Sequence, residues 1–235
     1  YVGDTGEPAA QQVWDEHYAG VWLMKPNGGQ VLDSTANGNH GTIYGATAIQ
    51  GPTGTAMRFD GVDDYISIPS YTIRPSDFTL VAGIDLPRPP PGESTIFFGR
   101  GPSVDRWWLE VSGSGFVYFQ LSDGISGRSH TVDTYNTNNY PPGVSVVALS
   151  VAADLDAGSS DAKYYRHGML VNNALVSVVN QGTTVGSQIA AGGSAAASRL
   201  TGDIHIVTLS EIARSPAWIA ATNAVLHDTF VTYSY

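Results

Sequence analysis

Two stretches decide the fold of this chain: Asp33-Ser-Thr-Ala-Asn-Gly-Asn-His-Gly41 and Phe59-Asp-Gly-Val-Asp-Asp-Tyr-Ile-Ser-Ile-Pro69. The first stretch gathers Asp, Asn and Gly residues, which favour compact polar turns. The second is an acidic turn that opens into alternating polar and apolar residues, a pattern typical of a half-buried β-strand. Together they predict strands that bury one face and turns that are built from Asx and Gly residues.

The same alternation continues along most of the chain. It is found in Phe78–Ile84, Trp107–Val111, Phe116–Leu121, Val144–Val151 and Ile204–Val207. Turn clusters separate these runs, as expected for antiparallel strands. The exception begins at Ser215, where a capping Ser, a Pro at the first helical position and an Ala-rich run predict one short helix. The pattern therefore predicts an all-β fold with one helix near the C-terminus.

The composition excludes several classes of protein. The chain has 235 residues, of which 42% are hydrophobic and 14% charged, and its formal net charge is −10. The hydrophobic content argues against disorder, and the negative charge argues against a nucleic-acid partner. The absence of cysteine excludes disulfides and thiolate metal sites. No apolar run approaches the roughly 20 residues that span a bilayer, so we expect no membrane insertion.

Several motifs, taken in order, resemble the laminin G-like branch of the concanavalin A-like lectin/glucanase superfamily. They are Val21-Trp-Leu-Met24, Asp33–Gly41, Met57–Tyr65, Phe78-Thr-Leu80, Tyr165–Val171 and Gly202–Pro216. The resemblance implies a jelly-roll β-sandwich of two antiparallel sheets with one short C-terminal helix. Because that fold hosts many roles, the resemblance does not name a ligand.

The chain is expected to contain a leading segment, residues 1–19, and one lectin-like domain, residues 20–235. Residues 1–18 resemble the end of a secreted β domain that precedes such domains in bacterial and phage surface proteins. The alternative is that they add an edge strand to the sandwich. Because the sequence begins with Tyr1 and has no charged leader, we expect no signal peptide in it and infer that it was cut from a longer precursor.

Asp33, Asn37 and Asn39 place oxygen atoms in one compact loop, as a Ca²⁺ site requires. Similar proteins often hold a structural calcium between this loop and a strand near the C-terminus. In that strand the family has an Asp where this chain has His205, and imidazole is a poor ligand for a hard cation. Asp203, two residues earlier, is the candidate replacement. The alternative is a metal-free turn in which Asx side chains cap backbone N–H groups.

A candidate ligand site lies on the predicted strands Arg106–Val111 and Phe116–Leu121. If the apolar residues of both strands face the core, the other face carries Arg106, Trp108, Glu110, Tyr118 and Gln120. An aromatic ring beside charged and amide groups suits a sugar, because it offers a platform and directional hydrogen bonds. The alternatives are a face covered by a loop, or a Trp that covers the sheet beside an Arg106–Glu110 ion pair.

The sequence shows no enzyme motif. Glucanases of this fold carry Glu-x-Asp-x-(x)-Glu on one strand, whereas the glutamates here are isolated: Glu7, Glu16, Glu93, Glu110 and Glu211. The adjacent pair Asp63 and Asp64 is expected to point to opposite faces of a strand. No two histidines have the spacing of a zinc site. We therefore expect a protein without catalytic residues.

These observations predict a non-catalytic module that binds a glycan or surface polysaccharide. We expect it to be extracellular, on a cell surface or on a virus particle. The main alternative is a purely structural decoration or fibre component of a phage or cell-surface assembly, with neighbouring subunits as partners. A polysaccharide-degrading enzyme is the third interpretation.

Overall fold

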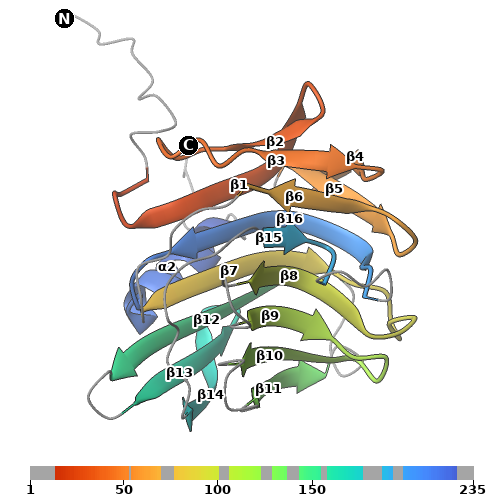
Figure 1. Cartoon of the computed structure of the whole chain (residues 1–235). Coiled ribbons are helices and arrows are strands. Elements are labelled where there is room, and N and C mark those ends of the chain that lie inside the picture. The colour runs from red at the N-terminus through yellow and green to blue at the C-terminus, as the bar shows by residue number, and fades with distance from the viewer. Residues whose placement is uncertain are drawn as a thin grey trace, which may run out of the picture.

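The computed structural model describes residues 14–52, 54–69, 77–100, 106–122, 129–136, 143–154, 158–176, 187–192 and 198–226. Within these ranges the strands follow one antiparallel hydrogen-bonded path that folds over into two layers (Figure 1). The first layer, in spatial order, is β11 (Ser129–Asn136), β10 (Phe116–Ser122), β9 (Arg106–Val111), β8 (Ser94–Arg100), β15 (Ser187–Ile189), β6 (Tyr65–Ile68) and β3 (Gly41–Tyr44).

The path continues from β3 into the second layer. In spatial order this layer is β2 (Gln30–Asp33), β1 (Tyr18–Asn27), β16 (Thr201–Ser210), β7 (Phe78–Asp85), β12 (Ser145–Asp154), β13 (Ser159–Arg166) and β14 (Met169–Val176). A hairpin of β4 (Thr47–Gly51) and β5 (Gly54–Asp60) joins it through pairing of β5 with β16. The architecture is the predicted all-β jelly-roll sandwich.

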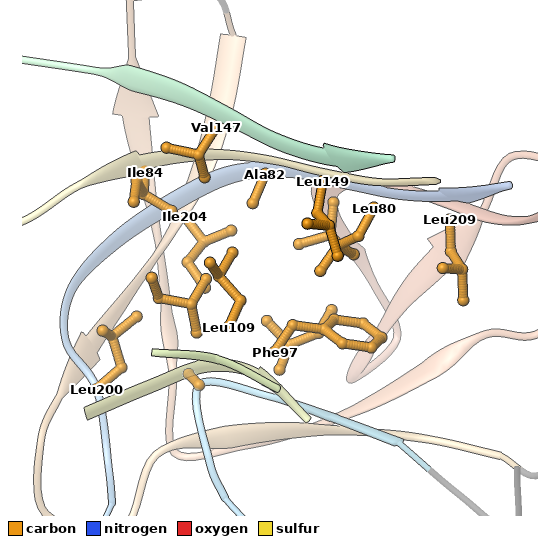
Figure 2. Packing of buried hydrophobic residues seen from close by; sticks show 14 of the residues in the cluster. Leu80, Ala82, Ile84, Phe97, Leu109, Val147, Leu149, Leu200, Ile204 and Leu209 are labelled. Atoms are coloured by element: carbon orange, nitrogen blue, oxygen red, sulfur yellow. The ribbon is translucent and has the colours of Figure 1, made fainter. Parts of the chain in front are cut away.

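The core lies between the two layers (Figure 2). Leu80, Ile84 and Leu149 extend from β7 and β12 toward Phe97 and Leu109 on β8 and β9, and each is at most 3% exposed. Burial of each such side chain stabilises the fold by roughly 1.5–3 kcal/mol relative to exposure. The two layers are therefore held together chiefly by apolar contacts that the strand alternation supplies.

Helix α2 (Pro216–Leu226) covers part of the outer face of the second layer. The Ser215 hydroxyl accepts a hydrogen bond of 3.2 Å from the Trp218 backbone N–H, as the predicted N-cap requires. Ile219 packs against Val81 and Val146 on that face. Among the described residues, no helix is long and apolar enough to cross a membrane.

The N-terminal strand begins before residue 20. Strand β1 starts at Tyr18, which pairs with Ser210 of β16. Residues 1–13 lie outside the described part of the chain. The leading segment and its likeness to a preceding domain therefore stay predictions.

Candidate functional site

The candidate ligand site lies on three neighbouring strands of the first layer. Glu110 of β9 pairs with Tyr118 of β10, and Trp108 pairs with Gln120. On the other side of β9, Thr95 of β8 pairs with Glu110. Because residues opposite one another in a ladder point to the same face, these five side chains share one face of the sheet. We call them the Trp108 face.

The opposite side of the same strands points into the core, as the alternation predicts. Leu109, Val111, Val117 and Phe119 are between 0% and 3% exposed. Trp108, Tyr118 and Gln120 are partly exposed, so the predicted inward and outward sets are confirmed for these residues. The side chain of Arg106, which the sequence also placed on this face, lies outside the described part of the structure.

Glu110 is more buried than its place on the outer face indicates. Its side chain is 8% exposed, and its Oε1 accepts a hydrogen bond of 3.0 Å from the Thr95 hydroxyl. Burial raises the pKa of Glu110, while hydrogen bonds from Thr95, Tyr118 and Trp108 act in the opposite direction. Glu110 is therefore shielded from solvent and accepts hydrogen bonds from its neighbours on the face.

Tyr118 joins Glu110 to an acid that sequence reasoning missed. Its hydroxyl donates a hydrogen bond to Oε1 of Glu93, an exposed residue directly before β8. Burial, the hydrogen bond to Glu93 and the charge of Glu110 raise the pKa of Tyr118, so the hydroxyl keeps its proton. Glu93 and Glu110 have no acidic partner at strand spacing in the sequence, but both lie beside Tyr118 in the folded chain. The registers of β8 with β9 and of β9 with β10 bring these three residues together.

The Trp108 face offers the groups that a sugar needs. The Trp108 ring can support the apolar side of a pyranose, since aromatic faces pack against such flat surfaces. The Gln120 amide both donates and accepts hydrogen bonds, and the Glu93 carboxylate accepts them from hydroxyls. Glu110 and Thr95 hold the polar groups around them in place.

The loop predicted to bind calcium is held by its own hydrogen bonds. Asp33 is 4% exposed, and its Oδ1 accepts hydrogen bonds from the N–H groups of Val21 (2.9 Å) and Thr35 (3.0 Å). Its Oδ2 accepts from the Thr35 hydroxyl (2.8 Å) and the Asn39 N–H (2.9 Å). Both carboxylate oxygens are therefore occupied by donors from the chain.

The two Asn side chains of this loop fasten it to β1. The Asn37 amide donates to the Tyr18 carbonyl at 2.7 Å, and the Asn39 amide donates to the Ala19 carbonyl at 2.8 Å. Amide N–H groups aimed at carbonyls are the arrangement of a capped turn and do not form a cage of oxygens. This donor set does not fit Ca²⁺, and it agrees with the metal-free alternative.

Asp203 lies away from this loop. Trp22 pairs with Asp33 on one side and with Val207 on the other, so Asp203 is four residues further along β16, roughly 13 Å at the usual strand rise. There Asp203 accepts two hydrogen bonds of 2.8 Å from Arg58. The structure therefore does not bring the four predicted metal ligands together.

The acidic turn before β6 is also held by its own backbone. Asp60 Oδ1 accepts from the Val62 N–H at 2.8 Å, and Asp64 Oδ2 accepts from the Asp60 N–H at 3.0 Å. One carboxylate oxygen each of Asp60, Asp63 and Asp64 lies within 4.8 Å of the others. The expected divergence of Asp63 and Asp64 is wrong, because both precede the strand and lie in the bend. Burial raises the pKa of Asp64.

A family model described as "Concanavalin A-like lectin/glucanases superfamily" matches residues 60–220. Among curated protein sequences, none matches the chain. The match spans the Trp108 face and most strands of both layers, so it concerns the part of the chain that carries the candidate site.

Solved structures of similar fold come from several kinds of protein. A Trypanosoma rangeli sialidase in complex with sialic acid has a TM-score of 0.64 and 17% identity, over 93% of this chain and 34% of the sialidase chain. The binding domain of Paraclostridial Mosquitocidal Protein 1 has a TM-score of 0.68 and 10% identity, over 89% of this chain and 52% of that chain. The chain thus spans between a third and about half of these two proteins.

A third similar structure is close to this chain in size. Domain 4 of an extracellular arabinanase from Geobacillus stearothermophilus, solved with arabinotriose, has a TM-score of 0.61 and 16% identity. The match covers 87% of this chain and 97% of that domain. At such low identities these likenesses show the fold alone.

Proposed function

Because the chain belongs to the concanavalin A-like lectin/glucanases superfamily, we propose that it is a non-catalytic carbohydrate-binding module. The observation that carries the proposal is the Trp108 face, where a partly exposed indole on β9 lies opposite Gln120 and diagonally across from Tyr118, both on β10. An indole beside neutral hydrogen-bonding groups binds a sugar ring without reacting with it. We further propose that the module acts outside the cell, on a cell surface or on a virus particle.

The similar structures support a binding role. The arabinanase domain was solved with a trisaccharide, and the mosquitocidal protein's domain is described as a binding domain. The low charged fraction of the present chain, 14%, leaves a surface rich in hydroxyl and amide groups. Such groups exchange hydrogen bonds with sugar hydroxyls at little cost in desolvation compared with full charges.

A glycan array tests the proposal. We expect the wild-type chain to be retained by a subset of glycans and Trp108→Ala to lose that retention, because the platform is removed. Trp218→Ala is the matched control, since Trp218 is also partly exposed but lies on α2, against the second layer. Equal retention of wild type and Trp108→Ala would contradict the proposal.

One observation favours a hydrolase as an alternative. Glu93 and Glu110 both contact the Tyr118 hydroxyl, and paired carboxylates with one raised pKa are the usual machinery of glycoside hydrolysis. Incubating a retained polysaccharide with the protein and assaying new reducing ends separates the two functions. Product that disappears in Glu110→Gln would establish the hydrolase, whereas binding without product agrees with the module.

A different observation favours the structural alternative. Strand β14 lies at the end of the second layer and exposes apolar side chains: Met169 (69%), Leu170 (53%), Val171 (48%) and Leu175 (77%). Apolar side chains gathered on an edge strand favour contact with another chain. Sedimentation velocity tests this, and a stable oligomer that Leu175→Lys disperses would support an assembly role.

A further inference from the structure

A second candidate site lies on the other layer of the sandwich. A pocket of about 320 Å³ opens on the outer face of the second layer, beside the C-terminal end of α2. Its walls come from β1, β5, β7, β16, α2 and the start of β12. This volume is at the lower end of the range of small-molecule sites.

The pocket exists because strand pairing along β16 changes partner. Strand β1 pairs with β16 as far as Val207, and β5 pairs with it from Ile204 onward. His205 and Ile206 fall between the two ladders. On the other side of β16 the register with β7 shifts between Ile204 and Ile206, so His205 is the extra residue of a β-bulge. Such bulges re-aim a side chain, and this one places His205 in the pocket wall.

Strand β1 is distorted at the same place. Met24 has a φ of 53°, in the left-handed region that side chains other than glycine rarely adopt, and the β1–β2 register shifts between Trp22 and Pro26. Met24 itself is buried in the core, while its neighbours Leu23 and Lys25 line the pocket. Strain of this kind persists only where the surrounding structure holds it, and it is frequent at binding sites.

His205 is a buried polar residue of the pocket wall that has no hydrogen-bond partner among the described residues. It is 8% exposed, and neither Nδ1 nor Nε2 has a hydrogen-bond partner among the described residues. Burial lowers its pKa, although Asp203 and Asp85 act in the opposite direction, so the ring is neutral at pH 7. A neutral imidazole has one N–H donor and one acceptor, and a buried ring with both unused is unusual.

The rest of the pocket defines the ligand chemistry. Leu23, Val146 and Val225 supply apolar walls, and Thr55 supplies a hydroxyl. Lys25 is exposed and forms no ion pair with any described residue, so its ammonium group is available to an anion. We propose that this pocket binds a short amphiphilic carboxylate, with its chain against the apolar walls and its carboxylate at His205 and Lys25.

Calorimetric titration with octanoate tests the proposal, and two molecules of the same chain length serve as controls. Octanol keeps the apolar chain without the charge, and octylammonium reverses the charge. We expect octanoate to bind at least tenfold more tightly than octanol, because charge-assisted hydrogen bonds are the stronger kind. Octylammonium should bind more weakly than octanol, because Lys25 repels it. Equal binding of all three would overturn the proposal.

Two variants locate the binding. His205→Phe keeps a ring in the bulge but removes both nitrogens, and Lys25→Met keeps the apolar stem but removes the charge. Each should weaken octanoate binding about tenfold and leave octanol binding unchanged. If His205→Phe does not fold, Lys25→Met still decides, because Lys25 is exposed. Octanoate binding that Lys25→Met leaves intact would overturn the proposal.

NMR of the wild-type chain gives an independent readout. The imidazole ¹⁵N resonances of His205 should shift on addition of octanoate, and the indole resonance of Trp108 on the other layer should not. Shifts confined to other residues would place the ligand elsewhere and overturn the proposal. Self-association that Lys25→Met abolishes, with no octanoate binding, would assign the pocket to a second copy of the chain and equally overturn it.

Discussion

Replacement of Asp33 tests whether the Asp33–Gly41 loop holds itself without a metal. The Asp33 carboxylate accepts three backbone N–H groups and one hydroxyl, at distances between 2.8 and 3.0 Å. Asp33→Ala removes every acceptor, and Asp33→Asn keeps one oxygen in nearly the same volume. The two variants therefore remove different numbers of hydrogen bonds from one buried site.

The expected losses follow from counting donors that lose their acceptor. In Asp33→Ala the N–H groups of Val21, Thr35 and Asn39 are left unpaired, at about 1–3 kcal/mol each before the loop relaxes, so we expect a loss of about 4 kcal/mol. In Asp33→Asn only the Asn39 N–H loses its acceptor, because the Thr35 hydroxyl can turn to accept, and we expect about 2 kcal/mol. For a chain of this size these losses correspond to about 12 °C and 6 °C in melting temperature.

Urea unfolding followed by tryptophan fluorescence measures both losses. Trp22 is a suitable reporter, since its indole N–H donates to the Asn39 carbonyl at 2.8 Å. Each protein is unfolded once with calcium and once with EDTA, and we expect the wild-type curves to coincide. A lower stability of the wild-type chain in EDTA, or an Asp33→Ala loss no larger than that of Asp33→Asn, would refute a metal-free loop held by Asp33.

Three further predictions concern single groups. Gly45→Ala should destabilise by about 2 kcal/mol or more in thermal melts, because Gly45 has a φ of 73° and a Cβ there would lie 2.0 Å from Asp64 Oδ1. The hydrogen bonds from Arg214 lower the pKa of Asp15, so the stability that this pair contributes above pH 3.8 should be lost as the pH falls below that value. Urea unfolding at several pH values measures this loss, and Asp15→Asn should remove the contribution of Asp15 to the pH dependence. Burial lowers the pKa of His205, so just below pH 6.5 the unfolded chain takes up a proton at this residue more readily than the folded chain does. The unfolding free energy measured in urea should therefore fall as the pH drops below 6.5. His205→Phe should make this pH dependence weaker.

Features set by neighbouring residues could be predicted from the sequence. The inward positions of Leu109 and Phe119 follow from strand alternation, which is local along the chain. The start of α2 after Ser215 follows from capping, which is equally local. The jelly-roll topology could be predicted from the order of separated motifs, because that order resembles a family whose topology is known.

Features that depend on pairing between distant segments could not be predicted. Glu93 meets Tyr118 only through the β8–β9–β10 registers, and Arg58 meets Asp203 across 145 residues of sequence. The bulge at His205 arises where β16 changes its partner strand from β1 to β5, and no local pattern marks it. The Asp33–Gly41 loop could not be assigned for a different reason, since its Asp, Asn and Gly residues suit both a metal site and a capped turn.

The most direct test of a binding role for the Trp108 face is an NMR titration of the wild-type chain with an oligosaccharide retained on the array. We expect the indole N–H resonance of Trp108 to shift to saturation, the resonance of Trp218 to stay unchanged, and the oligosaccharide to remain intact. Binding that leaves the Trp108 resonance in place would contradict a binding role for the Trp108 face.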